Sequence, residues 1–181
     1  MVLLPDLLTH YAVSYLIASR SFKPRRALLV ALMGLLPDID ALFRVHRWVT
    51  HSLVLTALAV AIAVLSVSAT RREYLGYAAL LSALYTLHIV MDVFTGPTPV
   101  LWPLSNKEYA VSIGVNGIIS CGGVGMDPYA ELAISDADFT QKPVVNGPVV
   151  SATGVVASIA VAALILAERF RALNKNRFPN F

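Results

Sequence analysis

Apolar runs separated by short polar segments dominate the chain. Five runs stand out, at residues 7–19, 27–36, 52–70, 75–91 and 148–167. The third and fifth hold 19 and 20 residues without a charged side chain. As helices they would be about 28–30 Å long, which matches the hydrocarbon thickness of a bilayer. The fourth is nearly as long. The first two are short: they could span by extending into flanking residues, pack as half-inserted helices, or be buried helices of a soluble core. We predict an all-α, multi-pass membrane bundle of about five helices.

The composition agrees with a membrane protein. Hydrophobic residues make up 57% of the 181 positions, charged residues only 14%, and the mean hydropathy is +0.69. Soluble domains carry about 25% charged residues, so the composition disfavours both disorder and a free soluble globule. The net charge of +3 does not indicate nucleic-acid binding, because the basic residues form short clusters between apolar runs. A single cysteine, Cys121, excludes an intramolecular disulfide framework and a multi-cysteine zinc site.

The distribution of lysine and arginine predicts the orientation in the membrane. If all five runs cross, the segments between runs one and two, between runs three and four, and after run five lie on one side. These segments hold ten of the fourteen basic residues, whereas the other side holds nine of the eleven acidic residues. We therefore predict a multi-pass protein of the cell membrane with an extracytoplasmic N-terminus, a cytoplasmic C-terminus and no removable signal peptide.

The connection from residue 93 to residue 147 is unusually long and rich in glycine and proline. Strand-like runs occur within it at residues 109–113 and 117–120. Connections of this length are uncommon unless they are functional, so we expect an irregular or small β cap on the extracytoplasmic side. The whole chain, 1–181, is interpreted as one membrane-embedded domain, with 93–147 as its outer subregion.

Imidazole and carboxylate side chains gather at the extracytoplasmic ends of the runs. We expect Pro37 to end the second run, because the residue before a proline leaves the helical region, and Thr50 or Ser52 to cap the third. This arrangement brings seven candidate metal ligands to one membrane face: His10, Asp38, Asp40, His46, His51, His88 and Asp92. Since the orientation rests on lysine and arginine alone, the convergence supports it independently.

Such a set of side chains indicates a metal site. His88 and Asp92 are four residues apart and share a helix face, so they can bind one ion or two adjacent ions. Imidazoles and carboxylates suit zinc, manganese or iron, and seven ligands exceed the needs of one tetrahedral ion, which favours two ions. Taken singly, His88 could be a hydrogen-bonded core histidine and residues 38–40 an ordinary turn. However, ionisable groups within a membrane segment are costly and usually functional.

Four motifs resemble those of a known family. They are GLLPDID at residues 34–40, HRWVTHS at 46–52, HIVMD at 88–92 and LWPLS at 101–105. Together they are similar to the motifs of membrane-bound, metal-dependent hydrolases related to the LexA-regulated inner-membrane hydrolase of enteric bacteria, over roughly residues 1–115. That family resembles in turn the zinc-dependent phospholipases C and the P1-type nucleases, which are all-α enzymes with clustered zinc ions.

The resemblance implies a ligand set. One zinc would be bound by Asp38 (or Asp40), His51, His88 and Asp92. Asp92 would bridge to a second zinc shared with His10. The chain lacks the N-terminal tryptophan ligand of the distant relatives and has no histidine after His88. A third zinc is therefore not expected, and His46 and Asp40 are the candidates to fill the gap.

The predicted function is a membrane-bound, metal-dependent hydrolase that binds one or two divalent ions, with zinc as the first choice. The metal would activate water, and Asp40 or the second histidine pair would orient it. Arg47 would either hold a phosphate or lie at the interface as an ordinary arginine. The resemblance to phospholipases implies a phosphoester in a lipid or lipid-linked substrate, and no nucleic acid. The alternatives are a metal transporter or sensor with the same ligands, and a structural membrane protein with a tolerated polar cluster. The sequence motifs of P-loop NTPases, serine esterases and zincin proteases are absent.

Overall fold

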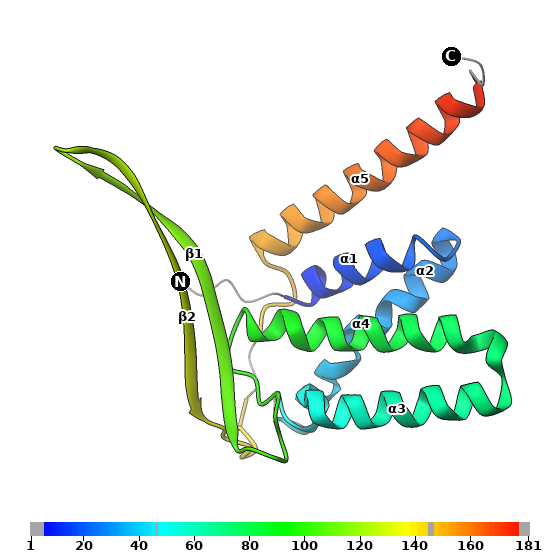
Figure 1. Ribbon diagram of the computed structural model, residues 1–181, viewed down its shortest axis with the longest axis horizontal. Helices are drawn as coiled ribbons and strands as arrows, with labels where there is room; N and C mark the ends of the chain where they lie inside the picture. Colours follow the sequence, from blue (N-terminus) through cyan, green and yellow to red (C-terminus); the bar gives the residue numbers. More distant parts are fainter. Residues whose placement is uncertain (1–5, 46, 145–146, 178–181) are drawn as a thin grey trace. The chain divides into compact units, whose positions relative to one another are not determined.

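The computed structural model describes residues 6–45, 47–144 and 147–177, with side chains as far as Arg171 (Figure 1). The α-helices of this part of the chain are α1 (Leu7–Ala18), α2 (Pro24–Ala31), α3 (Leu53–Thr70), α4 (Leu75–Val93) and α5 (Ala152–Arg177). The 3₁₀ helices are η1 (Leu32–Phe43), η2 (Val49–His51) and η3 (Arg72–Tyr74). The strands β1 (Lys107–Ser120) and β2 (Gly123–Asp136) lie between α4 and α5 in the chain.

The described chain divides into two compact units. Unit 1 contains residues 36–45 and 47–144, and unit 2 contains residues 6–35 and 147–177. Unit 1 holds α3, α4 and both strands, while unit 2 combines α1 and α2 with α5. The 3₁₀ helix η1 begins in unit 2 and ends in unit 1.

A long antiparallel β-ribbon in unit 1 shows that the all-α prediction is wrong. β1 and β2 have 14 residues each and pair in register along their whole length, around a turn at Cys121 and Gly122. The strand-like runs at 109–113 and 117–120 are parts of one strand. Apolar and polar residues alternate through both strands, but interspersed glycines and a proline give the segment the composition of a loop. The cap expected within 93–147 therefore contains a regular β element.

Three helices in the described part of the chain are long and apolar enough to cross a membrane: Leu53–Thr70, Arg72–Val93 and Ala152–Arg171. These correspond to the third, fourth and fifth apolar runs. α1 and α2 contain 12 and 8 residues, fewer than the roughly 20 that a crossing helix needs. That the first two runs also cross the membrane, which would make five crossings, therefore stays a prediction. The expected cap of α3 is confirmed at Ser52, whose Oγ accepts a hydrogen bond from the Leu55 backbone N–H at 3.1 Å.

In unit 2, α1 lies along α5 and runs in the same direction (Figure 1). The buried carboxylate of Asp6 caps α1 by accepting from the Thr9 backbone N–H at 2.7 Å. It also accepts from the backbone N–H of Ser151, just before α5 begins. Gly154 is required where α5 passes this carboxylate, because a Cβ there would lie 2.3 Å from Asp6 Oδ1. The starts of the two helices are thus held together through one carboxylate.

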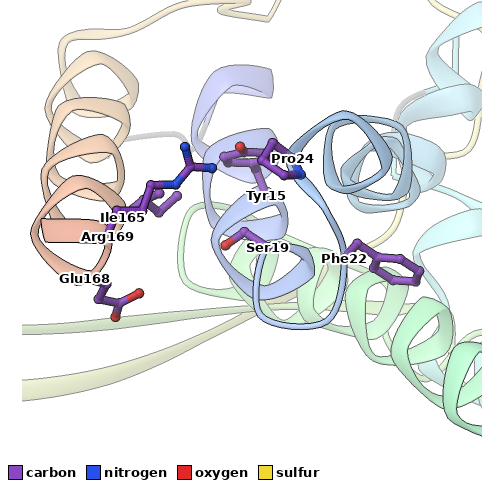
Figure 2. Close-up of a pocket in the computed structure, with 7 residues that line it drawn as sticks. All are labelled: Tyr15, Ser19, Phe22, Pro24, Ile165, Glu168 and Arg169. Atoms are coloured by element: carbon purple, nitrogen blue, oxygen red, sulfur yellow. The ribbon is translucent and has the colours of Figure 1, made fainter. Parts of the chain in front are cut away.

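The far ends of α1 and α5 enclose an open pocket beside the start of α2 (Figure 2). Its lining residues are Tyr15, Ser19, Phe22, Pro24, Ile165, Glu168 and Arg169. The only carboxylate among these lining residues, Glu168, forms an ion pair with Arg20. The pocket therefore offers no set of metal-binding groups.

Replacing Asp6 with asparagine should lower stability. Burial opposes the charge of Asp6, but hydrogen bonds from Ser151 and Thr9 outweigh it and hold the pKa of this carboxyl below its usual range. A pKa that is depressed by folding stabilises the folded state above the unfolded pKa, and this contribution is lost as the pH falls through the folded pKa. Asp6→Asn should therefore lower the free energy of unfolding by about 1 kcal/mol at neutral pH, and by less in acid.

Thermal unfolding of the purified protein in detergent, at neutral and at acidic pH, measures this difference. Asp127→Asn is the matched control, because Asp127 is exposed on β2. Equal unfolding midpoints for Asp6→Asn and the wild type at neutral pH would contradict the role given to Asp6.

Candidate metal centre

The local fold around Pro37 decides where two carboxylates point. The sequence predicted that the second apolar run ends at Pro37, and this is wrong: the chain changes from α2 to η1 at Leu32 and continues through Pro37. A proline can occupy this position because its fixed φ suits a helix and only one backbone donor is lost. Since a 3₁₀ helix has three residues per turn, Asp38 and Asp40 project in different directions.

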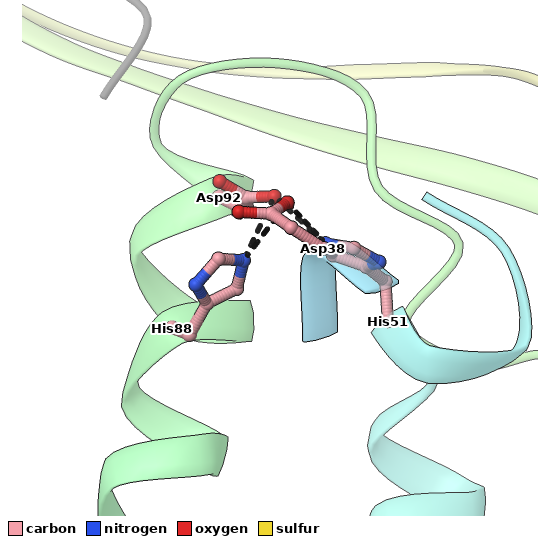
Figure 3. Close-up of side chains that lie close together, drawn as sticks. All are labelled: Asp38, His51, His88 and Asp92. Carbon is pink, nitrogen blue, oxygen red and sulfur yellow. Dashed lines mark ion pairs between the residues drawn. The ribbon is translucent and has the colours of Figure 1, made fainter. Parts of the chain in front are cut away.

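Four ionisable side chains converge in unit 1 (Figure 3). η1 supplies Asp38, η2 ends with His51, and α4 supplies His88 and Asp92. Nε2 of His51 lies 3.6 Å from Asp38 Oδ1 and 3.2 Å from Asp92 Oδ2. Nε2 of His88 lies 3.5 Å and 3.7 Å from the same two oxygens. Nitrogen and oxygen atoms therefore alternate around a small ring, which we call the Asp–His cluster.

The spacing of the Asp–His cluster fits one divalent ion. A tetrahedral ion with bonds of about 2.0–2.1 Å keeps its ligand atoms roughly 3.3 Å apart, and the four nitrogen–oxygen distances run from 3.2 to 3.7 Å. All four ligand atoms lie within 4.8 Å of one another. Two imidazoles and two carboxylates suit zinc, manganese or iron, and the two carboxylate charges balance a divalent cation.

Asp40 holds His51 from the other side of its ring. Asp40 Oδ2 lies 2.9 Å from His51 Nδ1 and accepts hydrogen bonds from Thr50 Oγ1 and the Trp48 backbone N–H, both at 2.8 Å. This contact favours a proton on Nδ1 and leaves Nε2 to bind an ion, as is usual for metal-ligating histidines. In this geometry Asp40 is a positioning residue rather than a member of the cluster.

Carboxylates around His51 also favour its protonated form. Burial opposes the positive charge, but hydrogen bonds to Asp38, Asp40 and Asp92 outweigh it and raise the pKa of His51 to about 10. Burial likewise opposes the charge of Asp38, but hydrogen bonds from His51 and His88 outweigh it and hold the pKa of that carboxyl well below its usual range. A cation at His51 Nε2 must displace a proton, so metal binding should strengthen as the pH rises.

Arg47 fixes the orientation of Asp92. Its Nε donates to Asp92 Oδ2 at 3.0 Å, while its terminal nitrogens donate to Thr95 Oγ1 at 3.2 Å and the Pro97 carbonyl at 3.3 Å. The guanidinium packs against Gly96, where a Cβ would lie 2.3 Å from a terminal nitrogen. The Arg47 side chain is only 11% exposed. Arg47, for which the sequence left phosphate binding and an interfacial role open, thus contacts a residue of the Asp–His cluster.

Two further predicted ligands, His10 and His46, stay predictions. His10 is a buried residue of α1 in unit 2. His46 lies outside the described residues. The four-ligand geometry supports one ion, and the second ion predicted from seven ligands stays a prediction.

Sequence reasoning considered Thr50 only as a helix cap and missed Thr95 and Gly96, all of which help to hold the cluster in place. Thr50 bonds Asp40, while Thr95 and Gly96 contact Arg47. Small polar residues of this kind produce no periodic pattern. Only the adjacency of Thr95 and Gly96 to the end of α4 could have drawn attention to them.

The effects of Asp38→Asn and Asp40→Asn on zinc binding should distinguish a metal ligand from a residue that positions a ligand. Asp38→Asn removes a charged ligand, so we expect zinc binding to be lost. Asp40→Asn keeps all four ligands but loses the orientation of His51, so zinc affinity should fall by about 10- to 100-fold. Zinc titration of chelator-treated protein measures both, and the wild type should bind more tightly at about pH 8 than at about pH 6 because His51 must lose a proton.

Asp127→Asn makes the same chemical change at an exposed position and should leave zinc binding unchanged. The assignment is wrong if Asp38→Asn binds zinc as tightly as this control does.

Comparison with protein-family models matches residues 6–169 to the family described as YdjM inner membrane protein. The matched range includes all four residues of the Asp–His cluster and the three candidate spans, apart from the last two residues of the third. No curated protein and no solved structure matches the chain significantly. The three long apolar helices agree with an inner-membrane location. Because the match covers most of its length, the chain belongs to the YdjM inner membrane protein family.

Proposed function

We propose that this protein is a membrane-bound, metal-dependent hydrolase that acts on a phosphoester of a lipid or lipid-linked molecule. The observation that carries the proposal is the Asp–His cluster, whose spacing fits one divalent ion. Such an ion polarises a phosphoryl oxygen and lowers the pKa of the water that it binds. Membership in an inner-membrane family supports the membrane setting.

Asp38 marks the side from which a substrate can approach. Its side chain is 19% exposed, whereas the side chains of His51, His88 and Asp92 are at most 3% exposed. Zinc accepts a fifth ligand and manganese commonly more, so four protein ligands leave room for water or a phosphoryl oxygen near Asp38. Asp40 supports this geometry through His51, and this role replaces the water-orienting role expected from sequence.

Apolar and aromatic side chains near the Asp–His cluster favour a lipid substrate. Phe43, at the end of η1, and Leu104 are 63% and 80% exposed. Trp48, Trp102 and Phe139 form an aromatic cluster with ring centroids 6.2–6.4 Å apart. Tryptophan is enriched at the membrane–water interface, and apolar side chains this exposed are suited to contact with lipid. A headgroup at this level would reach Asp38 while its tails stay in the bilayer.

The position of the ligands favours a hydrolase over a transporter. α3 carries no charged or imidazole side chain between Leu53 and Thr70, both ends included. α4 carries none before His88. These two fully described helices therefore provide no second set of ligands further along the bilayer, which a path for an ion would need.

Arg47 is proposed to keep Asp92 in place rather than to hold the phosphate of the substrate. Its guanidinium donates hydrogen bonds to three protein groups, on Asp92, Thr95 and Pro97. Lysine cannot reproduce a planar fork of donors, so Arg47→Lys should weaken metal binding as well as turnover. A role in substrate binding alone would leave metal affinity unchanged.

Wild-type protein in phospholipid nanodiscs, loaded with zinc or manganese, should release phosphate or a phosphorylated headgroup. Phospholipids and polyprenyl phosphates are the substrate classes to screen. Asp38→Asn should lower turnover at least about a hundredfold, because it removes a ligand of the ion that would activate water. Asp127→Asn should match the wild type. Metal-loaded wild type that cleaves none of these substrates would contradict the proposal, and zinc uptake into sealed vesicles by the same protein would identify a transporter.

In the proposed orientation the Asp–His cluster lies outside the cytoplasm and the C-terminus inside. The reason is that most lysines and arginines fall in segments on the C-terminal side of the membrane. A reporter fused after residue 175 should be active in the cytoplasm. A reporter inserted at the turn formed by Cys121 and Gly122 should be active only outside. The reverse pattern would place the cluster on the cytoplasmic side.

A further inference from the structure

The β-ribbon has two chemically different faces. Side chains alternate across a strand, and the pairing of β1 with β2 has no bulge. One face carries an ion pair of Lys107 with Asp136 at its base. Beyond this pair, all side chains on that face are apolar except for one glycine position, across residues 109–119 of β1 and 124–134 of β2. We call this the apolar face of the ribbon.

The opposite face is mostly polar. It carries the acidic residues Glu108, Asp127 and Glu131 and no basic residue within the two strands. The ribbon is therefore amphipathic along its full length, and its polar face has a net negative charge.

The described part of the protein leaves much of the apolar face uncovered. Ile119, Val124 and Met126 near the turn are 87%, 82% and 81% exposed. Closer to the base, Ile113 and Leu132 are still 68% and 60% exposed. Continuous exposed apolar surface marks an interaction site, and a two-stranded ribbon is only marginally stable in water by itself. The apolar face therefore needs an apolar partner.

The base of the ribbon is fixed at the end of α4 that carries the Asp–His cluster. Thr98, shortly after α4, exchanges two backbone hydrogen bonds of 3.0 Å with Tyr109 at the start of β1. Phe139, just after β2, packs in the aromatic cluster with Trp48 and Trp102. Within unit 1 the strands run across the direction of α3 and α4 rather than alongside them (Figure 1). If α3 and α4 cross the bilayer, the ribbon starts at its surface and extends along it.

We propose that the apolar face of the ribbon docks on the lipid surface of the leaflet at this end of α4. Two observations favour this partner: the ribbon leaves from the end of a candidate span, and tryptophans lie at its base. Docking at the surface also suits the backbone. Each strand has an outer edge whose N–H and C=O groups need partners, which headgroups and water supply and hydrocarbon does not.

The charge distribution sets the orientation of the docked ribbon. With the apolar face on the lipid, Glu108, Asp127 and Glu131 face water. The opposite orientation would place three carboxylates against the headgroups and expose the apolar face. This inference goes beyond the proposed hydrolase activity and holds whether or not the Asp–His cluster is catalytic.

Neighbouring positions on β1 allow a direct test. Val115 lies on the apolar face, Asn116 lies on the polar face, and both are exposed. Cys121 is the single cysteine of the chain and is exposed in the turn, so Cys121→Ser gives a background without thiols. Val115→Cys and Asn116→Cys in that background each take one environment-sensitive fluorophore. The full-length labelled protein is then studied in phosphatidylcholine nanodiscs.

The label at position 115 should emit at shorter wavelength and be quenched by a lipid-borne quencher. The label at position 116 should emit at longer wavelength and be quenched by iodide. Equal quenching of both labels by iodide would overturn the proposal, whether the ribbon stands away from the membrane or fails to form. The proposal would also be overturned if the label at position 115 were shielded from both quenchers, and only at a high protein-to-lipid ratio. That result would assign the apolar face to contact with a second copy of the chain.

Discussion

One carboxylate oxygen, Oδ2 of Asp92, is shared by three nitrogen atoms of unit 1. It lies 3.0 Å from Arg47 Nε, 3.2 Å from His51 Nε2 and 3.7 Å from His88 Nε2. Apolar helices gain little from packing against each other in lipid. The buried residues of α4 accordingly lie toward the Asp–His cluster, and the one buried residue of α3 is Thr56, near its start. Charge and hydrogen bonding thus hold together the ends of helices that are otherwise suited to contact with lipid.

The sequence predicted the long apolar helices and most of this cluster for clear physical reasons. Uninterrupted apolar runs specify α3, α4 and α5, and the four-residue spacing of His88 and Asp92 places both on one helix face. The convergence of Asp38 and His51 with them followed from the direction of the runs. The division of roles between Asp38 and Asp40 could not be predicted, because it depends on a 3₁₀ helix that continues through a proline.

Two other features were not predicted, because one depends on contacts between distant residues and the other has a sequence whose composition and periodicity disagree. The pairing of Arg47 with Asp92 joins residues 45 positions apart and depends on hydrogen bonds to Thr95 and Pro97. The β-ribbon does show alternation of apolar and polar residues, yet its glycines and one proline gave the segment the composition of a loop. Composition and periodicity disagreed there, and periodicity described the structure better. Unit 1 consequently presents metal-binding and apolar surfaces at the same end of α4.

The bond between Asp6 and the Ser151 backbone joins the start of the chain to a segment near its end. The described residues of unit 1, 36–45 and 47–144, all precede α5 in the chain, so that unit can be completed before α5 is synthesised. α1 can pack against α2 once both are made, but its contacts with α5 form only after α5 follows. Until then, the carboxylate of Asp6 must remain hydrated or accept hydrogen bonds from other donors. The contacts between α1 and α5 are therefore the last native contacts of α1 to form, after the whole of unit 1 has been made.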